Sequence, residues 1–147
     1  MIDARAPLGV LVVEDSDEDH DTVLEALAGA RRPVRTWRAE NGERCLALLR
    51  GEDGRAVRPA LVLLDLNTHG LDGRATLRTI KGDPDLRILP TVVFTTSSNP
   101  RDLELCFELG ANAFHVKPFD HLEHLELLRA VLDYWLGRVA LPDRLAL

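Results

Sequence analysis

The stretch VLLDLNTHG, from Val62 to Gly70, places an acidic residue directly after an apolar run. Apolar residues continue without a break to Leu64, and Asp65 follows them. Such a run is typical of a strand that is buried on both faces, as in a parallel sheet. A carboxylate at this depth costs free energy unless a cation or hydrogen-bond donors compensate for it. The stretch therefore predicts a central strand that ends at a functional acid.

On either side of this stretch, short apolar runs alternate with amphipathic segments, which is the pattern of an α/β protein. The predicted strands are Leu8–Val13, Val34–Ala39, Ala60–Leu64, Pro90–Thr95 and Ala113–Val116. The predicted helices are Asp17–Gly29, the segment between Asn41 and Gly51, Gly73–Lys81, Pro100–Leu109, and Leu122 to about Val139. Strict alternation with right-handed crossovers gives a doubly wound, five-stranded parallel sheet with helices on both faces.

Capping residues support two of these helices. Asn41 is a predicted N-cap, and Gly51 follows the end of the same helix. Asn99 is another predicted N-cap, with Pro100 at the first helical position and Gly110 after the end. These signals fix both ends of the second and fourth helices.

The composition narrows the class of protein. The chain has 147 residues, enough for one domain, with 46% apolar and 29% charged residues, as in ordinary globular proteins. A formal net charge of −6 argues against nucleic acid as the main ligand. No run is long enough for a membrane span or a signal peptide. We expect a cytoplasmic protein without nucleic-acid or membrane partners, in which Cys45 and Cys106 are buried thiols.

Reactive side chains follow four of the five predicted strands. Glu14 and Asp15 follow the first strand, Asp65 follows the third, Thr95 ends the fourth, and Lys117 follows the fifth. The carboxyl ends of parallel strands meet at one edge, where such sheets bind ligands. Clustered carboxylates repel one another, and a hard divalent cation such as Mg²⁺ relieves that repulsion. The set predicts phosphoryl transfer with Asp65 as the nucleophile.

These residues lie in motifs that resemble the receiver domain of bacterial two-component response regulators. The motifs are VVEDS (Val12–Ser16), LLDLN (Leu63–Asn67), DG (Asp72–Gly73), VVFTTS (Val92–Ser97) and GANAFHVKPF (Gly110–Phe119). The resemblance implies a flavodoxin-like (βα)5 fold with strand order 2-1-3-4-5. It implies a single receiver domain over residues 1–147, with a core of about 8–136, a C-terminal extension of about 137–147 and no output domain.

The resemblance also implies how the acids act. Asp65 would take the phosphoryl group from the phosphohistidine of a sensor histidine kinase. Mg²⁺, or Mn²⁺, would be held by Asp15, Asp65 and the backbone carbonyl of Asn67, with Glu14 acting through water. Asn67 and Ser97 match positions that tune dephosphorylation, and we expect both to be exposed to the attacking water.

The remaining family positions concern the phosphoryl group and the switch. Thr95 would hydrogen-bond the phosphoryl group and Lys117 would neutralise it, with the Lys117–Pro118 bond resembling the cis peptide of the family. Activation would couple Thr95 to Phe114. Because Phe lacks the hydroxyl of the more familiar Tyr, any switch here would depend on packing, and a plain core role for Phe114 is the alternative.

The run from Asp72 to Asp120 is similar to stand-alone receivers that partner bacterial and cyanobacterial phytochromes, which are light-sensing histidine kinases. A phytochrome-type kinase is therefore the expected partner. One segment departs from the family pattern: Thr68-His69-Gly70 stands where many receivers carry Pro and an apolar residue. We expect His69 to be a solvated loop histidine, with contact to the site as the alternative.

The last predicted helix carries two apolar stripes. One stripe comprises Leu125, Leu128, Leu132 and Trp135, and the other comprises Leu127, Val131 and Tyr134. One stripe is enough to pack a helix on a sheet. We therefore expect the second stripe to be exposed and to form a homodimer, together with the strand-five side of the fourth helix.

Three other functions share parts of this sequence pattern. A phosphorelay intermediate, which passes the phosphoryl group to another histidine, shares all of this chemistry, and the sequence does not separate it from a terminal switch. An aspartyl phosphatase of the haloacid dehalogenase type needs an acid two residues after the nucleophile, where this chain has Asn67. A flavin-binding flavodoxin needs a phosphate-cradling loop, where EDSDEDHD is acidic. We expect a phosphoacceptor switch that catalyses only its own phosphorylation and dephosphorylation.

Overall fold

The computed structural model describes residues 7–142, and these form five parallel strands that alternate with five α-helices. The strands are β1 (Leu8–Val13), β2 (Val34–Ala39), β3 (Leu61–Leu64), β4 (Thr91–Thr95) and β5 (Ala113–Val116). The helices are α1 (Asp17–Leu27), α2 (Gly42–Arg50), α3 (Gly73–Gly82), α4 (Pro100–Leu109) and α5 (His121–Asp133). The sheet order is β2-β1-β3-β4-β5 with every pairing parallel, as predicted.

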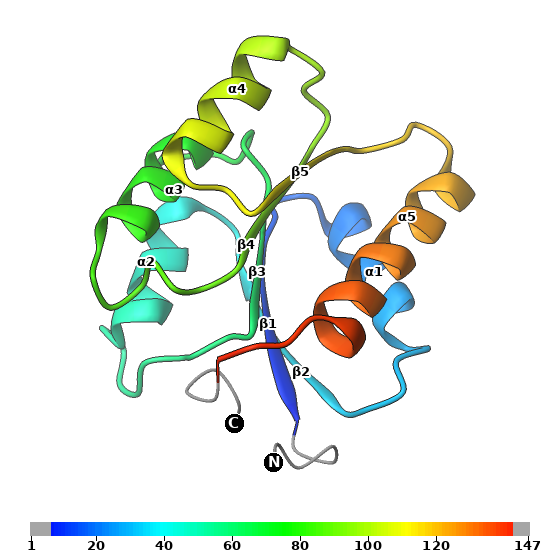
Figure 1. Ribbon diagram of the computed structural model, residues 1–147, viewed down its shortest axis with the longest axis horizontal. Coiled ribbons are helices and arrows are strands. Elements are labelled where there is room, and N and C mark those ends of the chain that lie inside the picture. Colours follow the sequence, from blue (N-terminus) through cyan, green and yellow to red (C-terminus); the bar gives the residue numbers. More distant parts are fainter. Residues whose placement is uncertain (1–6, 143–147) are drawn as a thin grey trace.

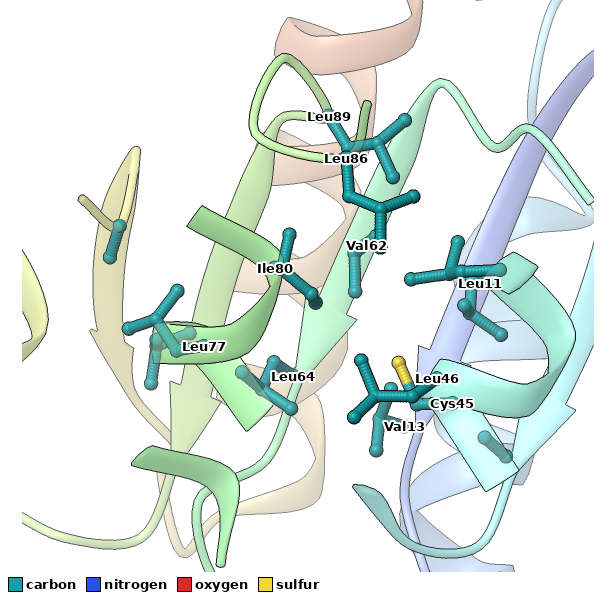
Figure 2. Close-up of a cluster of buried hydrophobic side chains, with 14 of the residues drawn as sticks. Leu11, Val13, Cys45, Leu46, Val62, Leu64, Leu77, Ile80, Leu86 and Leu89 are labelled. Atoms are coloured by element: carbon teal, nitrogen blue, oxygen red, sulfur yellow. The ribbon is translucent and has the colours of Figure 1, made fainter. Parts of the chain in front are cut away.

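Helices cover both faces of the sheet. Figure 1 views the sheet nearly along its edge, with α2, α3 and α4 on one side and α1 and α5 on the other. Successive side chains of a strand point to opposite faces, so β3 divides between the two cores. Val62 and Leu64 pack beneath α2 and α3, whereas Leu61 and Leu63 pack beneath α1 and α5. Figure 2 shows the first of these clusters, which includes the buried thiol of Cys45.

The predicted caps are confirmed. The Asn41 side chain accepts a backbone hydrogen bond from the first turn of α2, and Gly51 ends that helix in the left-handed region at φ 72°. Asn99 caps α4 in the same way, and Gly110 ends α4 at φ 104°. Both α2 and α4 therefore begin and end where the sequence predicts.

The last helix differs from the prediction. Its α-helical part ends at Asp133 and continues as one π-helical segment, η1 (Tyr134–Arg138). The expected exposed stripe is wrong for two of its three residues, because Val131 is buried and Leu127 is half-buried against the core; only Tyr134 is exposed. The cause is that α5 packs against α1 as well as the sheet, which requires a wider apolar face. The other stripe packs on the core as predicted: Leu125, Leu128, Leu132 and Trp135.

Exposed apolar side chains gather elsewhere. They include Leu103 and Phe107 on α4, Val116 on β5, Phe119 in the loop before α5, and Leu122 at the start of α5. In Figure 1, β5 lies between α4 on one side of the sheet and α5 on the other. Within residues 7–142, no helix has the length and apolar character needed to cross a membrane.

Candidate functional site

The strand ends bring the predicted site residues together. Backbone hydrogen bonds extend the sheet one residue past β1 and β3, because Glu14 N–H donates to Ala39 at 2.9 Å and Asp65 N–H donates to Val13 at 3.1 Å. Past β5, Lys117 N–H donates to the Thr95 carbonyl at 2.7 Å. The side chains that follow the strands are therefore held by the sheet itself rather than by free loops.

Lys117 is the centre of the site. Its Nζ donates to Glu14 Oε2 at 2.6 Å, to Asp19 Oδ2 at 2.8 Å and to Asp65 Oδ2 at 3.1 Å. The Lys117 side chain is only 5% exposed, so these three carboxylates replace its hydration. Asp19 was not among the predicted site residues; it lies in the first turn of α1, just after the N-cap Ser16.

Burial and charge act on this cluster in opposite directions. Burial, opposed by the nearby Lys117, raises the pKa of the Glu14 carboxyl to about 7. For Lys117, burial favours the neutral amine, but the charges of Asp65 and Glu14 outweigh it and raise the pKa above its ordinary value. The lysine therefore stays charged, and the carboxylates compete for it.

A divalent cation would offset the negative charge that Lys117 leaves unpaired at this site. Carboxylate oxygens of Glu14, Asp15 and Asp65 lie within 4.8 Å of one another. Lys117 contacts three carboxylates, from Glu14, Asp19 and Asp65, and Asp15 adds a fourth beside them, so the acids outnumber the single ammonium. Oxygen ligands at this density are what Mg²⁺ and Mn²⁺ prefer.

Glu14 and Asp65 use their carboxylate oxygens in the same way. Glu14 Oε2 accepts from Lys117, and Glu14 Oε1 accepts from Ser16 N–H at 3.0 Å. Asp65 Oδ2 also accepts from Lys117, and Asp65 Oδ1 accepts from Asn67 N–H at 3.1 Å. Both oxygens of each of these two buried acids therefore accept hydrogen bonds.

Thr95 is fully buried at the end of β4. Its Oγ1 accepts from the side chain of the exposed Asn67 at 3.3 Å and from Ser97 N–H at 3.3 Å. Phe114 is half-buried against the cluster beneath α2 and α3. The hydroxyl predicted to bind the phosphoryl group is therefore linked to both predicted dephosphorylation residues, while coupling of Thr95 to Phe114 stays a prediction.

Ser97 is not exposed as predicted. It is half-buried, and its hydroxyl donates to Asp102 Oδ2 at 2.6 Å. Arg74 holds Asp102 from the other side, with Nε at 2.8 Å and Nη2 at 2.7 Å from Asp102 Oδ1. The Ser97 hydrogen bond and then Arg74 lower the pKa of Asp102. A charged partner in the first turn of α4 thus holds the hydroxyl, and the local sequence gave no sign of it.

The expected cis peptide is wrong. The described residues contain no cis peptide bond, so Lys117–Pro118 is trans. The trans form is the lower-energy isomer of an X–Pro bond by about 0.5–1 kcal/mol. Lys117 reaches all three of its carboxylates with this bond trans.

Comparison with known proteins agrees with this geometry. The pattern of the "Response regulator receiver domain" matches residues 10–129. The chain belongs to this receiver family. As a receiver, it is a component of two-component signalling, in which a histidine kinase is the partner, and its cluster of Glu14, Asp15 and Asp65 has the oxygen ligands that a divalent metal needs.

Several relatives cover nearly the full chain. Response regulator Rcp1 of the cyanobacterium Synechocystis sp. is 34% identical over 95% of this chain and 97% of its own. The Mn²⁺-bound structure of Rcp1 has a TM-score of 0.88 and covers 93% of this chain and 100% of its own. The phosphorylated cyanobacterial phytochrome response regulator RcpA, 34% identical, has a TM-score of 0.90 over 94% and 100% of the two chains. RPA3017, from red-light signalling of R. palustris, has a TM-score of 0.81 at 32% identity over 92% and 99%.

Proposed function

We propose that Asp65 accepts a phosphoryl group from a histidine kinase and that the altered surface signals through protein contact. The observation that supports this most directly is the contact between Asp65 and the buried Lys117 at 3.1 Å. The buried Lys117 ammonium contacts Asp65, and the Thr95 hydroxyl is linked to the same site through Asn67, so a cation and a hydroxyl lie ready for a phosphoryl group on Asp65.

The proposed reaction is a direct transfer of the phosphoryl group from a histidine of the kinase to Asp65. An Asp65 carboxylate oxygen attacks the phosphorus of a phosphohistidine, forming a P–O bond as the P–N bond breaks. The imidazole nitrogen leaves with the electron pair of that bond. Lys117, already 3.1 Å from Asp65, neutralises negative charge on the transferred group, and Thr95 turns its hydroxyl to donate to it.

Mg²⁺ is the metal we propose for this site, with Mn²⁺ as a substitute. Asp15, Asp65 and the backbone carbonyl of Asn67 would hold it, and Glu14 would act through water. When bound, the ion offsets charge on the oxygens of the transferred group. The Mn²⁺ ion in the related Rcp1 structure supports this choice, because Mn²⁺, like Mg²⁺, prefers oxygen ligands.

Phosphorylation would also move the β4–α4 loop. When Thr95 turns toward a phosphoryl group, its hydrogen bond with Ser97 N–H must change. We expect this displacement to reach the half-buried ring of Phe114 on the neighbouring strand through packing alone. Asn67, exposed beside Asp65, would tune the lifetime of the phosphoryl group.

The proposed donor is a phytochrome-type kinase. The support is the likeness over nearly the whole chain to RcpA and RPA3017, whose names connect them with phytochrome or red-light signalling. A phosphorylated phytochrome kinase should pass its label to this chain faster than to an unrelated receiver. Equal rates of transfer to this chain and to the unrelated receiver would contradict this pairing.

We further propose a homodimer, on a surface that differs from the second stripe of the last helix. The candidate surface joins Phe107 on α4, Val116 on β5, Phe119 in the loop before α5, and Leu122 at the start of α5. Phe119 is fully exposed and Phe107 is 52% exposed, which is costly for a surface that stays in water. A Phe119→Asp, Leu122→Asp double variant should sediment as a monomer at tens of micromolar, where the parent chain sediments as a dimer. A monomeric parent chain would contradict the proposal.

The experiment on the main proposal measures intact mass. The protein is incubated with Mg²⁺ and acetyl phosphate, and Asp65→Asn is compared with Asp85→Asn, which changes an exposed acid outside the site. The parent chain and Asp85→Asn should each gain the mass of one phosphoryl group, and Asp65→Asn should gain none. A chain that gains no mass, or that gains it equally without divalent cation, would contradict the proposed reaction.

A further inference from the structure

The loop after β3 lies beside the carboxylates, and two backbone hydrogen bonds fix it there. His69 N–H donates to Asp15 Oδ2 at 3.2 Å, and Leu71 N–H donates to Glu43 Oε1 at 2.7 Å. Between them, Gly70 adopts φ 83°, and a Cβ at this position would lie 2.7 Å from a carboxylate oxygen of Glu43. The backbone of this loop therefore sets the position of His69 next to Asp15.

The imidazole of His69 shares the same carboxylate oxygen. Its Nε2 lies 3.5 Å from Asp15 Oδ2, although the ring is 97% exposed. An exposed pair of this kind contributes little to stability, so the loop, rather than the pair, determines where the ring lies. The ring keeps the freedom to turn about its side-chain torsions, and it stands on the solvent side of a carboxylate that the proposed metal needs.

We propose that His69 is an additional ligand of the divalent cation at Asp15 and Asp65, and that it shifts the site toward ions that bind imidazole, such as Ni²⁺, Co²⁺ and Zn²⁺. This inference rests on the metal site of the proposed function. It assigns a role to the Thr68-His69-Gly70 segment, which departs from the receiver pattern.

The distance between His69 Nε2 and Asp15 Oδ2 suits two ligands of one ion. Two ligand atoms about 2.1 Å from one ion lie about 3.0 Å apart at neighbouring octahedral positions and about 3.4 Å apart in a tetrahedron. The observed 3.5 Å between His69 Nε2 and Asp15 Oδ2 is close to both values. Among the described residues the group of mutually close ligand atoms comprises Glu14, Asp15 and Asp65, so the exposed His69 ring has to turn about its side-chain torsions to reach an ion held there.

The chemistry of the ligands gives the direction of the shift. Mg²⁺ prefers oxygen and gives up its water reluctantly, so an imidazole beside the site adds little to its binding. Borderline transition ions gain from an imidazole in place of a water. Loss of His69 should therefore weaken Ni²⁺ binding by about 10- to 100-fold, the range known for supporting residues at metal sites, and change Mg²⁺ binding by less than about twofold.

The test is calorimetric titration of the full chain, without a histidine tag, with Ni²⁺ and separately with Mg²⁺. His69→Ala removes the ring but keeps the backbone N–H that binds Asp15. His121→Ala is the matched control, because His121 is also exposed and also lies beside a carboxylate, with Nε2 at 3.4 Å from Glu25. A Co²⁺ absorption spectrum that changes with His69→Ala would give a second readout, of nitrogen coordination itself.

We expect His69→Ala to lose Ni²⁺ affinity selectively and His121→Ala to keep the affinity of the parent chain for both ions. Unchanged Ni²⁺ affinity in His69→Ala would overturn the inference. Equal loss for Ni²⁺ and Mg²⁺ would also overturn it, because it would indicate a loop defect rather than a lost ligand. The outcome is separate from the proposed function, which fails if Asp65 takes no phosphoryl group with Mg²⁺ or takes it equally without a divalent cation.

Discussion

Replacement of Lys117 by Met provides a strong test of the site's electrostatics. The variant keeps most of the volume of the side chain but removes the charge that three carboxylates share, from Glu14, Asp19 and Asp65. Glu14 and Asp65 are 6% and 9% exposed, so water cannot replace the lost ammonium at either of them. Asp19, at 30% exposure, is partly solvated and contributes less.

The size of the effect follows from this burial. Removal of one partner from a buried ion pair costs about 3–5 kcal/mol, and partial solvation and protonation of the remaining acids place Lys117→Met near the lower end, at about 3 kcal/mol. A metal that binds only the folded chain adds about 2.7 kcal/mol at a concentration of 100 times its Kd. Without the competing ammonium, the four carboxylates should bind Mg²⁺ more tightly than they do in the parent chain.

The assay is urea unfolding followed by far-UV circular dichroism, in EDTA and in Mg²⁺, with the exposed Arg78→Met as the control for loss of a positive charge. We expect Lys117→Met to be destabilised in EDTA and to gain more from Mg²⁺ than the parent chain does. If Lys117→Met were as stable as the parent in EDTA, or if Mg²⁺ stabilised the parent at least as much, the account of Lys117 as the site's internal cation would be wrong.

Three further predictions concern the surroundings of the site. Asp102→Asn and Ser97→Ala should each lower the free energy of unfolding by about 1 kcal/mol in urea unfolding. The double variant should lower it by less than the sum, because both substitutions act on the same hydrogen bond between Ser97 and Asp102; full additivity would contradict this. Burial lowers the pKa of His124 from 6.5, so the folded state binds fewer protons there than the unfolded state, and stability should fall as pH drops below 6.5. His124→Phe should flatten that pH dependence in a urea-unfolding series, and an unchanged slope would argue against it. A Cβ on Gly73 would lie 2.7 Å from the Asp65 carbonyl oxygen, so Gly73→Ala should cost about 1–3 kcal/mol and slow labelling by acetyl phosphate, whereas a parent-like labelling rate would show that the loop can adjust.

Local sequence signals were enough for the fold and for most of the site. The apolar run before Asp65 and the alternation of segments predicted the parallel sheet, and Asn41 and Asn99 predicted the starts of two helices. Since parallel strands end at one edge, the convergence of Glu14 and Lys117 followed from topology alone, although 103 residues separate them.

Contacts between helices could not be predicted from local sequence signals. Asp19 reaches Lys117 from the first turn of α1, where an acid is equally well explained by the helix dipole. Arg74 and Asp102 meet only because α3 and α4 lie side by side. Val131 is buried because α5 also packs against α1, and periodicity within one helix does not reveal a second neighbour.

The most direct test of the central claim is to locate the phosphoryl group itself. The chain is incubated with an autophosphorylated histidine kinase and Mg²⁺, and the acyl phosphate is located by fragmentation mass spectrometry. We predict a single phosphoryl group on Asp65, absent when Mg²⁺ is removed and absent in Asp65→Asn. A phosphoryl group that stays on the kinase, or that appears on Glu14, Asp15 or Asp19 instead of Asp65, would contradict the account.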